Sequence, residues 1–159
     1  MVEIVVSEYP SVSYRIAARG DTMNETLNVA QYFYLHAPQR PGEAARLLGG
    51  LRESGVNLLA LSGFPAGRRA QIDLVPADPA ALRAAARRHG WKLTGPKKVL
   101  LLSGEDRVGA MADVAERLAA TKINIVATQA VATGPGVYSA LLWVPPKDVN
   151  RAVKVLKSS

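Results

Sequence analysis

The chain repeats one short pattern of residues at a fixed distance. Arg40-Pro41-Gly42, followed by Gly55-Val56-Asn57, returns as Arg107-Val108-Gly109, followed by Lys122-Ile123-Asn124. The paired glycines and the paired asparagines are each 67 residues apart. A unit of this length is a small folded module rather than one turn of a solenoid. The 159 residues therefore hold two related modules, and what the copies share indicates how each module folds.

Each copy carries an amphipathic helix directly after the Pro-Gly or Val-Gly pair. Pro41 is suited to a first helical turn, and Gly55 is suited to end the helix in a left-handed conformation. Between them the apolar residues follow the spacing i, i+3, i+4 and i+7, which predicts one buried face. These positions are Ala44, Leu47, Leu48 and Leu51 in the first copy and Met111, Val114, Ala115 and Leu118 in the second.

Short apolar runs predict the strands of both modules. We expect strands at 32–35, 56–61 and 70–74 in the first copy and at 99–102, 123–127 and 137–144 in the second. The run 56–61 is almost continuously apolar, so we expect this strand to be covered on both faces. We expect 123–127 to be the matching buried strand of the second copy. Pro79 and Pro146 each open a second helix. A short last strand is expected at 91–93, whereas the second copy ends without an obvious one.

This order predicts the fold class. Strands and helices in the order βαββαβ, with both helices on one sheet face, form a ferredoxin-like α+β sandwich. The expected boundaries are an N-terminal extension at 1–30, a first module at 31–96 and a second at 97–159. A lone module of about 65 residues has a marginal core. We therefore expect the two modules to associate and the chain to form a homodimer.

The first thirty residues have no counterpart in the second copy, and two interpretations remain open. Val2–Val6 is a candidate strand that pairs with an exposed edge, in place of the missing last strand of the second module. Alternatively the segment is a leader, and Met23 begins the functional unit. We favour a minor functional role for this extension.

Composition excludes several classes of protein. The chain has no cysteine, which excludes disulfides, thiolate metal sites and a cysteine nucleophile. No apolar run approaches the roughly 18 residues of a membrane span, and no signal peptide is visible, so we expect a cytoplasmic protein without membrane contact. The formal charge of +7 suits anionic ligands. We do not expect nucleic-acid binding, because no block of like charges occurs and many arginines fit solvated helix faces.

The pattern of a strand, then Arg-Pro-Gly opening a helix, then Gly-Val-Asn-Leu opening a strand resembles the ACT domain. The resemblance covers residues 31 to about 156 and is closest to stand-alone tandem ACT proteins. It implies ferredoxin-like modules that bind amino acids and regulate metabolic enzymes, with the amino acid held between this loop and a facing module. The chain departs from the family pattern at Val108, where the family usually has Pro, and at Gln39, where Asn or Asp is common.

The residues of the two loops also indicate a ligand site, independently of this resemblance. The loop Gln39-Arg40-Pro41-Gly42 leads into a helix N-terminus, where free N–H groups and the helix dipole favour a carboxylate. The amide of Asn57 suits the ammonium and carboxylate of an amino acid. Asp106-Arg107-Val108-Gly109 with Asn124 would form the second site. Structural roles remain open: Asp106 as an N-cap, the asparagines as partners of local backbone, and both loop arginines as solvated side chains.

We expect no catalytic activity, no metal and no cofactor. The two histidines, His36 and His89, are not spaced to form a metal pair, and Glu105 and Asp106 are adjacent, so their side chains diverge. The sequence predicts a non-catalytic regulatory sensor of a small molecule, most simply a free amino acid, that acts on an enzyme or regulator carried by another chain. The alternative is a protein-interaction or assembly module whose ligand pockets are empty.

Overall fold

The computed structural model describes residues 25–157, so the candidate strand Val2–Val6 and the candidate start Met23 lie outside the described part of the chain. The elements follow the predicted order in both copies. They are β1 (Thr26–Pro38), α1 (Glu43–Glu53), β2 (Leu58–Ala66), β3 (Arg69–Pro76), α2 (Pro79–His89), β4 (Thr94–Glu105), α3 (Ala110–Ala120), β5 (Ala127–Gly134), β6 (Val137–Trp143), a 3-10 turn η1 (Pro146–Asp148) and α4 (Val149–Lys157).

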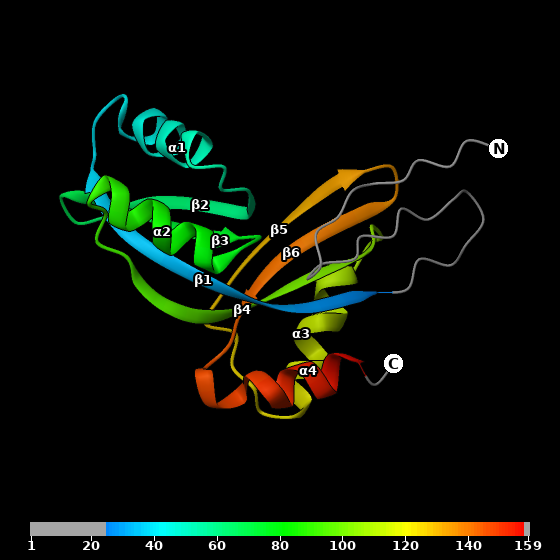
Figure 1. Cartoon of the computed structure of the whole chain (residues 1–159). Helices are drawn as coiled ribbons and strands as arrows, with labels where there is room; N and C mark the ends of the chain where they lie inside the picture. The colour runs from blue at the N-terminus through cyan, green and yellow to red at the C-terminus, as the bar shows by residue number, and fades with distance from the viewer. Residues whose placement is uncertain (1–24, 158–159) are drawn as a thin grey trace.

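The strands form one six-stranded sheet in the order β2-β3-β1-β4-β6-β5. All neighbouring strands are antiparallel. β1 and β4 are long and lie at the centre, where they join the two modules (Figure 1). The first half of β1 pairs with β4, from Thr26 opposite Ser103, and its second half pairs with β3, from Phe33 opposite Leu74. The predicted α+β fold of ferredoxin-like modules is confirmed.

Each module takes its fourth strand from the strand that opens the other module. The expected strand at 91–93 is wrong, because these residues are not in a strand and β4 begins only at Thr94. The start of β4 fills the fourth position of the first module, and the first half of β1 fills it in the second. β1 therefore begins before residue 30, inside the segment that the sequence separates as an extension. Gly95 allows the crossing, because a Cβ there would lie 2.9 Å from the carbonyl oxygen of Tyr32.

Two apolar cores lie beneath the two helix pairs. α1 and α2 cover Phe33 and Leu74, while α3 and α4 cover Leu100 and Leu142. Of the predicted helix faces, Leu47, Leu51, Val114 and Leu118 are buried, whereas Ala44 and Leu48 are exposed. Helix α1 ends as predicted, with Gly55 left-handed at φ 67°, and Lys122 takes the same conformation after α3 at φ 57°.

The strand after α1 is not covered on both faces and the strand after α3 is not buried, so both expectations are wrong. β2 and β5 are the two outer strands of the sheet, and every residue of β5 is exposed. The apolar run 123–127 is mostly a loop before β5, in which Ile123 joins the core and Val126 is exposed. The edge positions of these strands follow from the strand order, which a local apolar run does not encode.

We predict that the chain unfolds as one unit, because β1 and β4 belong to both modules. Trp91 packs against the first core and Trp143 lies in β6, so W143F and W91F leave one tryptophan reporting on each module. The urea transitions followed by the two tryptophans should coincide. Leu74→Ala should shift both by the same amount, with a loss of about 2–5 kcal/mol. The exposed Val131→Ala is the control, and two separate transitions would contradict the prediction.

Candidate functional site

The two helix-entry loops have the same backbone geometry. Gly42 and Gly109 precede α1 and α3 with φ of 89° and 86°, in the left-handed region that favours glycine. Neither helix has a side-chain cap, so its first N–H groups face the loop without a side-chain acceptor. All four residues of each loop are exposed, and Val108 is 100% exposed. The first N–H of each helix instead donates to a loop carbonyl, Glu43 to Arg40 at 3.5 Å and Ala110 to Arg107 at 3.2 Å, so only the N–H groups that follow are left for another acceptor.

The loop arginines are bound to acidic side chains of the following helix. Arg40 and Arg46 both donate to the buried Glu43 carboxylate, at 2.7 and 2.9 Å. These two hydrogen bonds hold the pKa of Glu43 below its usual range. In the second copy Arg107 pairs with Asp113. All three pairs have an exposed arginine, so each contributes little to stability. The pairs of Arg40 and Arg107 hold each loop against its helix.

Asp106 is not the N-cap of α3, because that position is taken by Gly109. Its backbone N–H instead donates to the Gly136 carbonyl at 2.9 Å, which ties the loop to the β5–β6 turn. The side chains of Asn57 and Asn124 are exposed and form no hydrogen bond with the described residues. The carbonyl oxygen of Asn57 accepts from the Ala77 N–H at 3.0 Å.

The chain does not bring the predicted site residues together. Gln39–Gly42 precedes α1 and Asn57 follows it, so a helix of 11 residues, about 16 Å long, separates them. Asp106–Gly109 and Asn124 are separated in the same way by α3. The two loops also follow the ends of β1 and β4, which run antiparallel, so they lie at opposite ends of the sheet. Within one chain neither loop faces the other module.

The two modules do meet over the sheet face that the helices leave free. There the outer strands β2 and β5 approach each other, and the Ser62 hydroxyl donates to the Gln129 side-chain oxygen at 2.6 Å. These two residues are 67 residues apart, the spacing of the duplication. The contact lies between two cavities on this concave face, to which both modules contribute.

The larger cavity has a volume of about 740 Å³, within the roughly 300–1,000 Å³ of small-molecule sites. Its walls include Tyr32, Phe64, Asp73, Lys97 and Trp143. Asp73 is only 6% exposed and accepts one hydrogen bond, from the Gln71 amide at 2.8 Å. Tyr32 and Trp143 meet edge to face, with ring centroids 5.9 Å apart. The Lys97 ammonium lies 4.7 Å from the centre of the Tyr34 ring.

Burial raises the pKa of Asp73, although Gln71, Lys97 and His36 oppose that rise. The same burial raises the pKa of Tyr32, and the Asp73 charge adds to the effect. In the part of the chain that the structure describes, Asp73 forms no ion pair. The cavity thus contains a partly desolvated carboxylate on which the Lys97 charge acts from a distance, without forming an ion pair.

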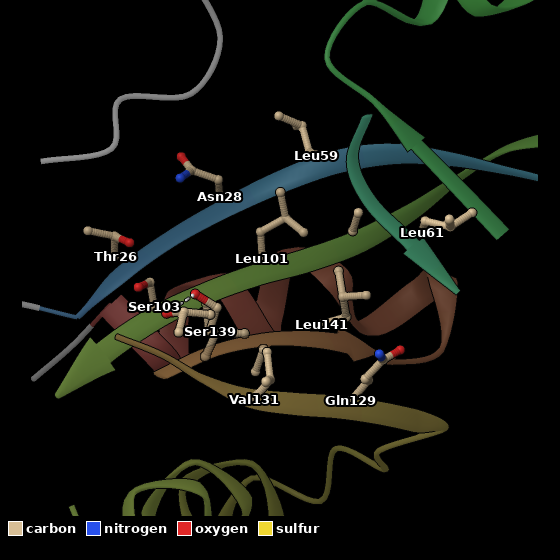
Figure 2. A pocket seen from close by; sticks show the side chains of 14 residues that line it. Thr26, Asn28, Leu59, Leu61, Leu101, Ser103, Gln129, Val131, Ser139 and Leu141 are labelled. Atoms are coloured by element: carbon tan, nitrogen blue, oxygen red, sulfur yellow. Dashed lines mark hydrogen bonds between the residues drawn. The ribbon is translucent and has the colours of Figure 1, made fainter. Parts of the chain in front are cut away.

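The smaller cavity, of about 280 Å³, lies over the second module. Figure 2 shows Leu59, Leu101 and Leu141 from three different strands around it, with the helices behind the sheet. Leu101 lies 67 residues after Tyr34 and pairs with Leu141, just as Tyr34 pairs with Asp73. The duplication therefore places an apolar pair where the first module has a tyrosine and an aspartate.

The sequence pattern identifies the orientation of Asp73 but not its surroundings. Gln71 and Asp73 alternate with Ile72 and Leu74, which predicts that they point away from the helices. Such positions are normally read as solvated. The cavity forms only because β2 and β5 approach each other across this face. The alternating pattern does not encode that approach, so the sequence analysis does not identify the cavity residues.

Neither His36 nor His89 lines the larger cavity. His36 meets Tyr34 edge to face, and His89 stacks on Trp91 with ring centroids 4.7 Å apart. Residues 25–157 contain no group of three His, Asp or Glu side chains placed to hold a metal ion. Among the helices described, none has the length and apolar character needed to span a membrane.

Comparison with known proteins places the fold. No protein-family model matches the sequence, and no curated protein matches it. Solved structures do match. A protein from Bacteroides thetaiotaomicron superposes with a TM-score of 0.72 and 20% identity, over 81% of this chain and 87% of that one. The ligand-free regulatory subunit of aspartate kinase from Thermus thermophilus superposes with a TM-score of 0.60 and 22% identity, over 85% of this chain and 95% of that one. The regulatory subunit of aspartate kinase from Thermus flavus superposes with a TM-score of 0.56 and 22% identity, over 86% of this chain and 95% of that one. These matches establish a shared fold.

We predict that Asp73→Asn stabilises the protein at neutral pH. A carboxyl whose pKa is raised by folding binds its proton more tightly in the folded state, so its ionised form opposes folding. This penalty applies above the pKa of Asp73 and disappears as the pH falls through it. The melting temperature of the variant should exceed that of the wild type at pH 7, and the difference should shrink toward about pH 4.

Thermal unfolding across this pH range measures the effect. The control is Asp106→Asn, because Asp106 is exposed and such substitutions change stability by about 0.5 kcal/mol or less. A lower melting temperature for Asp73→Asn at pH 7 would show that the carboxylate has a stabilising partner.

Proposed function

We propose that this protein is a non-catalytic regulatory sensor that binds a free amino acid at its helix-entry loops. Its ligand site comprises Gln39, Arg40, Pro41 and Gly42 with Asn57, and in the second copy Asp106, Arg107, Val108 and Gly109 with Asn124. The observation that carries the proposal is the duplicated left-handed glycine, Gly42 and Gly109, which presents an uncapped helix N-terminus in each module. The resemblance to ACT domains and the fold shared with regulatory subunits of aspartate kinase support it.

The chemistry of the loops suits an amino-acid carboxylate. The first N–H groups of α1 and α3 lack side-chain acceptors, and the positive end of the helix dipole adds to their attraction for an anion. The exposed amides of Asn57 and Asn124 offer donors and an acceptor for the rest of the ligand. Arg40 and Arg107 are held by acidic partners, so they brace the loops instead of binding the ligand.

A second copy of the chain completes each site. The loop and the asparagine of one module lie at opposite ends of an 11-residue helix, so one ligand does not reach both. In a homodimer the loop of one chain meets an asparagine of its partner. The exposed outer strand β5 offers a surface for such an association. Binding then favours the dimer, because a ligand shifts an equilibrium toward the state that holds it better.

The two sites are not equivalent. The first loop has neutral Gln39 where the second has Asp106, and Pro41 where the second has Val108. A carboxylate ligand is repelled by an acidic side chain beside the helix N-terminus. The first loop is the better anion site, because the Glu43 carboxylate in the first turn of α1 is already neutralised by Arg40 and Arg46. The second loop serves mainly to hold the ligand ammonium or the dimer.

We predict that one or a few of the twenty amino acids raise the melting temperature and that Gln39→Glu reduces this increase. A specific ligand stabilises the folded state by mass action. Glutamate at position 39 adds a negative charge beside the ligand carboxylate, and we expect a loss of affinity of about tenfold, or 1.4 kcal/mol. Thermal shift with the full panel, followed by titration of the active compound, measures both results.

The matched variant is Asp106→Gln, which gives the second loop the residue of the first. It should leave the ligand-induced shift intact or increase it. Sedimentation velocity with and without the ligand tests the role of the dimer. No shift with any amino acid at millimolar concentration would contradict the proposal and favour an assembly module with empty pockets.

A further inference from the structure

We infer that the larger cavity on the concave sheet face is a second ligand site, which binds a small molecule carrying a primary ammonium group on an apolar body. It is separate from the helix-entry loops, because its lining contains none of their residues. The site is formed by both modules: Asp73 comes from β3, Lys97 from β4 and Trp143 from β6.

The buried carboxylate defines the chemistry. An ionised carboxylate taken out of water is costly unless it is paired with a cation or well supplied with hydrogen bonds. Asp73 is 6% exposed, and among residues 25–157 it has one hydrogen-bond donor, Gln71, and no ion pair. A carboxylate has two oxygens and about four acceptor sites, so most of its capacity is unused. An ammonium group supplies the missing charge and up to three donors.

The aromatic walls suit the same ligand. Tyr32 and Trp143 lie edge to face in the cavity, and Phe64 of β2 contributes a third ring that is 45% exposed. Aromatic faces attract cations and also bind apolar groups, the cation contribution being about 0.5–2 kcal/mol. The combination of one carboxylate and several rings selects an organic amine over an inorganic cation, for which oxygen ligands would gather instead.

The duplication shows that folding does not require this arrangement. At the matching positions of the second module, Leu101 and Leu141 replace Tyr34 and Asp73, and Leu141 is 8% exposed. The same sheet face is therefore built from two leucines, without a buried charge. The smaller cavity, which Leu101 and Leu141 line, has a volume of about 280 Å³, whereas the larger cavity, which Asp73 lines, has about 740 Å³. A costly polar residue and a larger cavity occur together in only one copy, which indicates a ligand and not a packing requirement.

The position of Lys97 allows a test of whether the ligand is an amino acid or a simple amine. Its own ammonium lies over the Tyr34 ring at the cavity wall and does not pair with Asp73. An amino acid would place its ammonium on Asp73 and its carboxylate on Lys97, whereas a simple amine would use Asp73 alone. Both ligands share the contact with Asp73.

Three probes with the same ring test the proposal: 2-phenylethylamine, L-phenylalanine and 3-phenylpropionate. The W91F protein leaves Trp143 as the single tryptophan, so its fluorescence reports on the cavity. We expect the two ammonium compounds to change this fluorescence and to give heat in calorimetry, and 3-phenylpropionate to do neither. Asp73→Asn keeps the side-chain shape and should weaken amine binding about tenfold or more, because a charge-assisted hydrogen bond is lost.

Ser139→Ala, in the smaller cavity, is the matched control and should leave binding unchanged. Lys97→Met should weaken phenylalanine alone if the source is an amino acid, and neither compound if it is an amine. Gln39→Glu, which tests the helix-entry loops, should not alter Trp143 fluorescence titrations, so the two proposals fail independently. Binding of 3-phenylpropionate as tight as that of the amine, equal affinities in wild type and Asp73→Asn, or no response to any probe would overturn the inference.

Discussion

The antiparallel pairing of β1 with β4 is the interaction on which the rest of the molecule depends. These two strands pair seven residues in one register, from Thr26 opposite Ser103 to Tyr32 opposite Lys97, and pair Tyr34 with Thr94 after a register shift. Because each strand also opens a module, the pairing supplies both modules with a fourth strand. It also relates the copies by an approximate two-fold axis, since antiparallel strands exchange places under such a rotation. The helix pairs, the outer strands and both helix-entry loops take their positions from this axis (Figure 1).

The same axis explains what the sequence predicts and what it does not. Helix faces such as Val114 and Leu118 follow a local 3.6-residue period, so they are readable from one segment, and both are fully buried. The exposure of β5 depends on strand order, which no local run of residues encodes. The loops are recognised because glycine must occupy their left-handed positions. The cavity around Asp73 is missed because it needs β2 and β5 to approach across the sheet, a contact between residues 67 apart in sequence.

Duplication also gives the chain an internal comparison. Positions that agree between copies, such as Gly42 and Gly109, carry backbone requirements that any copy of this fold must meet. Positions that differ are free of those requirements. Asp73 opposite Tyr34 and Leu141 opposite Leu101 show that either chemistry is compatible with the sheet. The repeated features thus describe the module, and the unequal ones, in the loops and on the concave face, are where a function specific to this chain resides.

A ligand in the larger cavity would act on the relation between the modules. Asp73 belongs to the first module and Trp143 to the second, while Ser62 and Gln129 close the face beside them with a single exposed hydrogen bond. That bond alone contributes about 1 kcal/mol or less to the approach of β2 and β5. A molecule that contacts both modules stabilises the closed arrangement by its differential affinity for it.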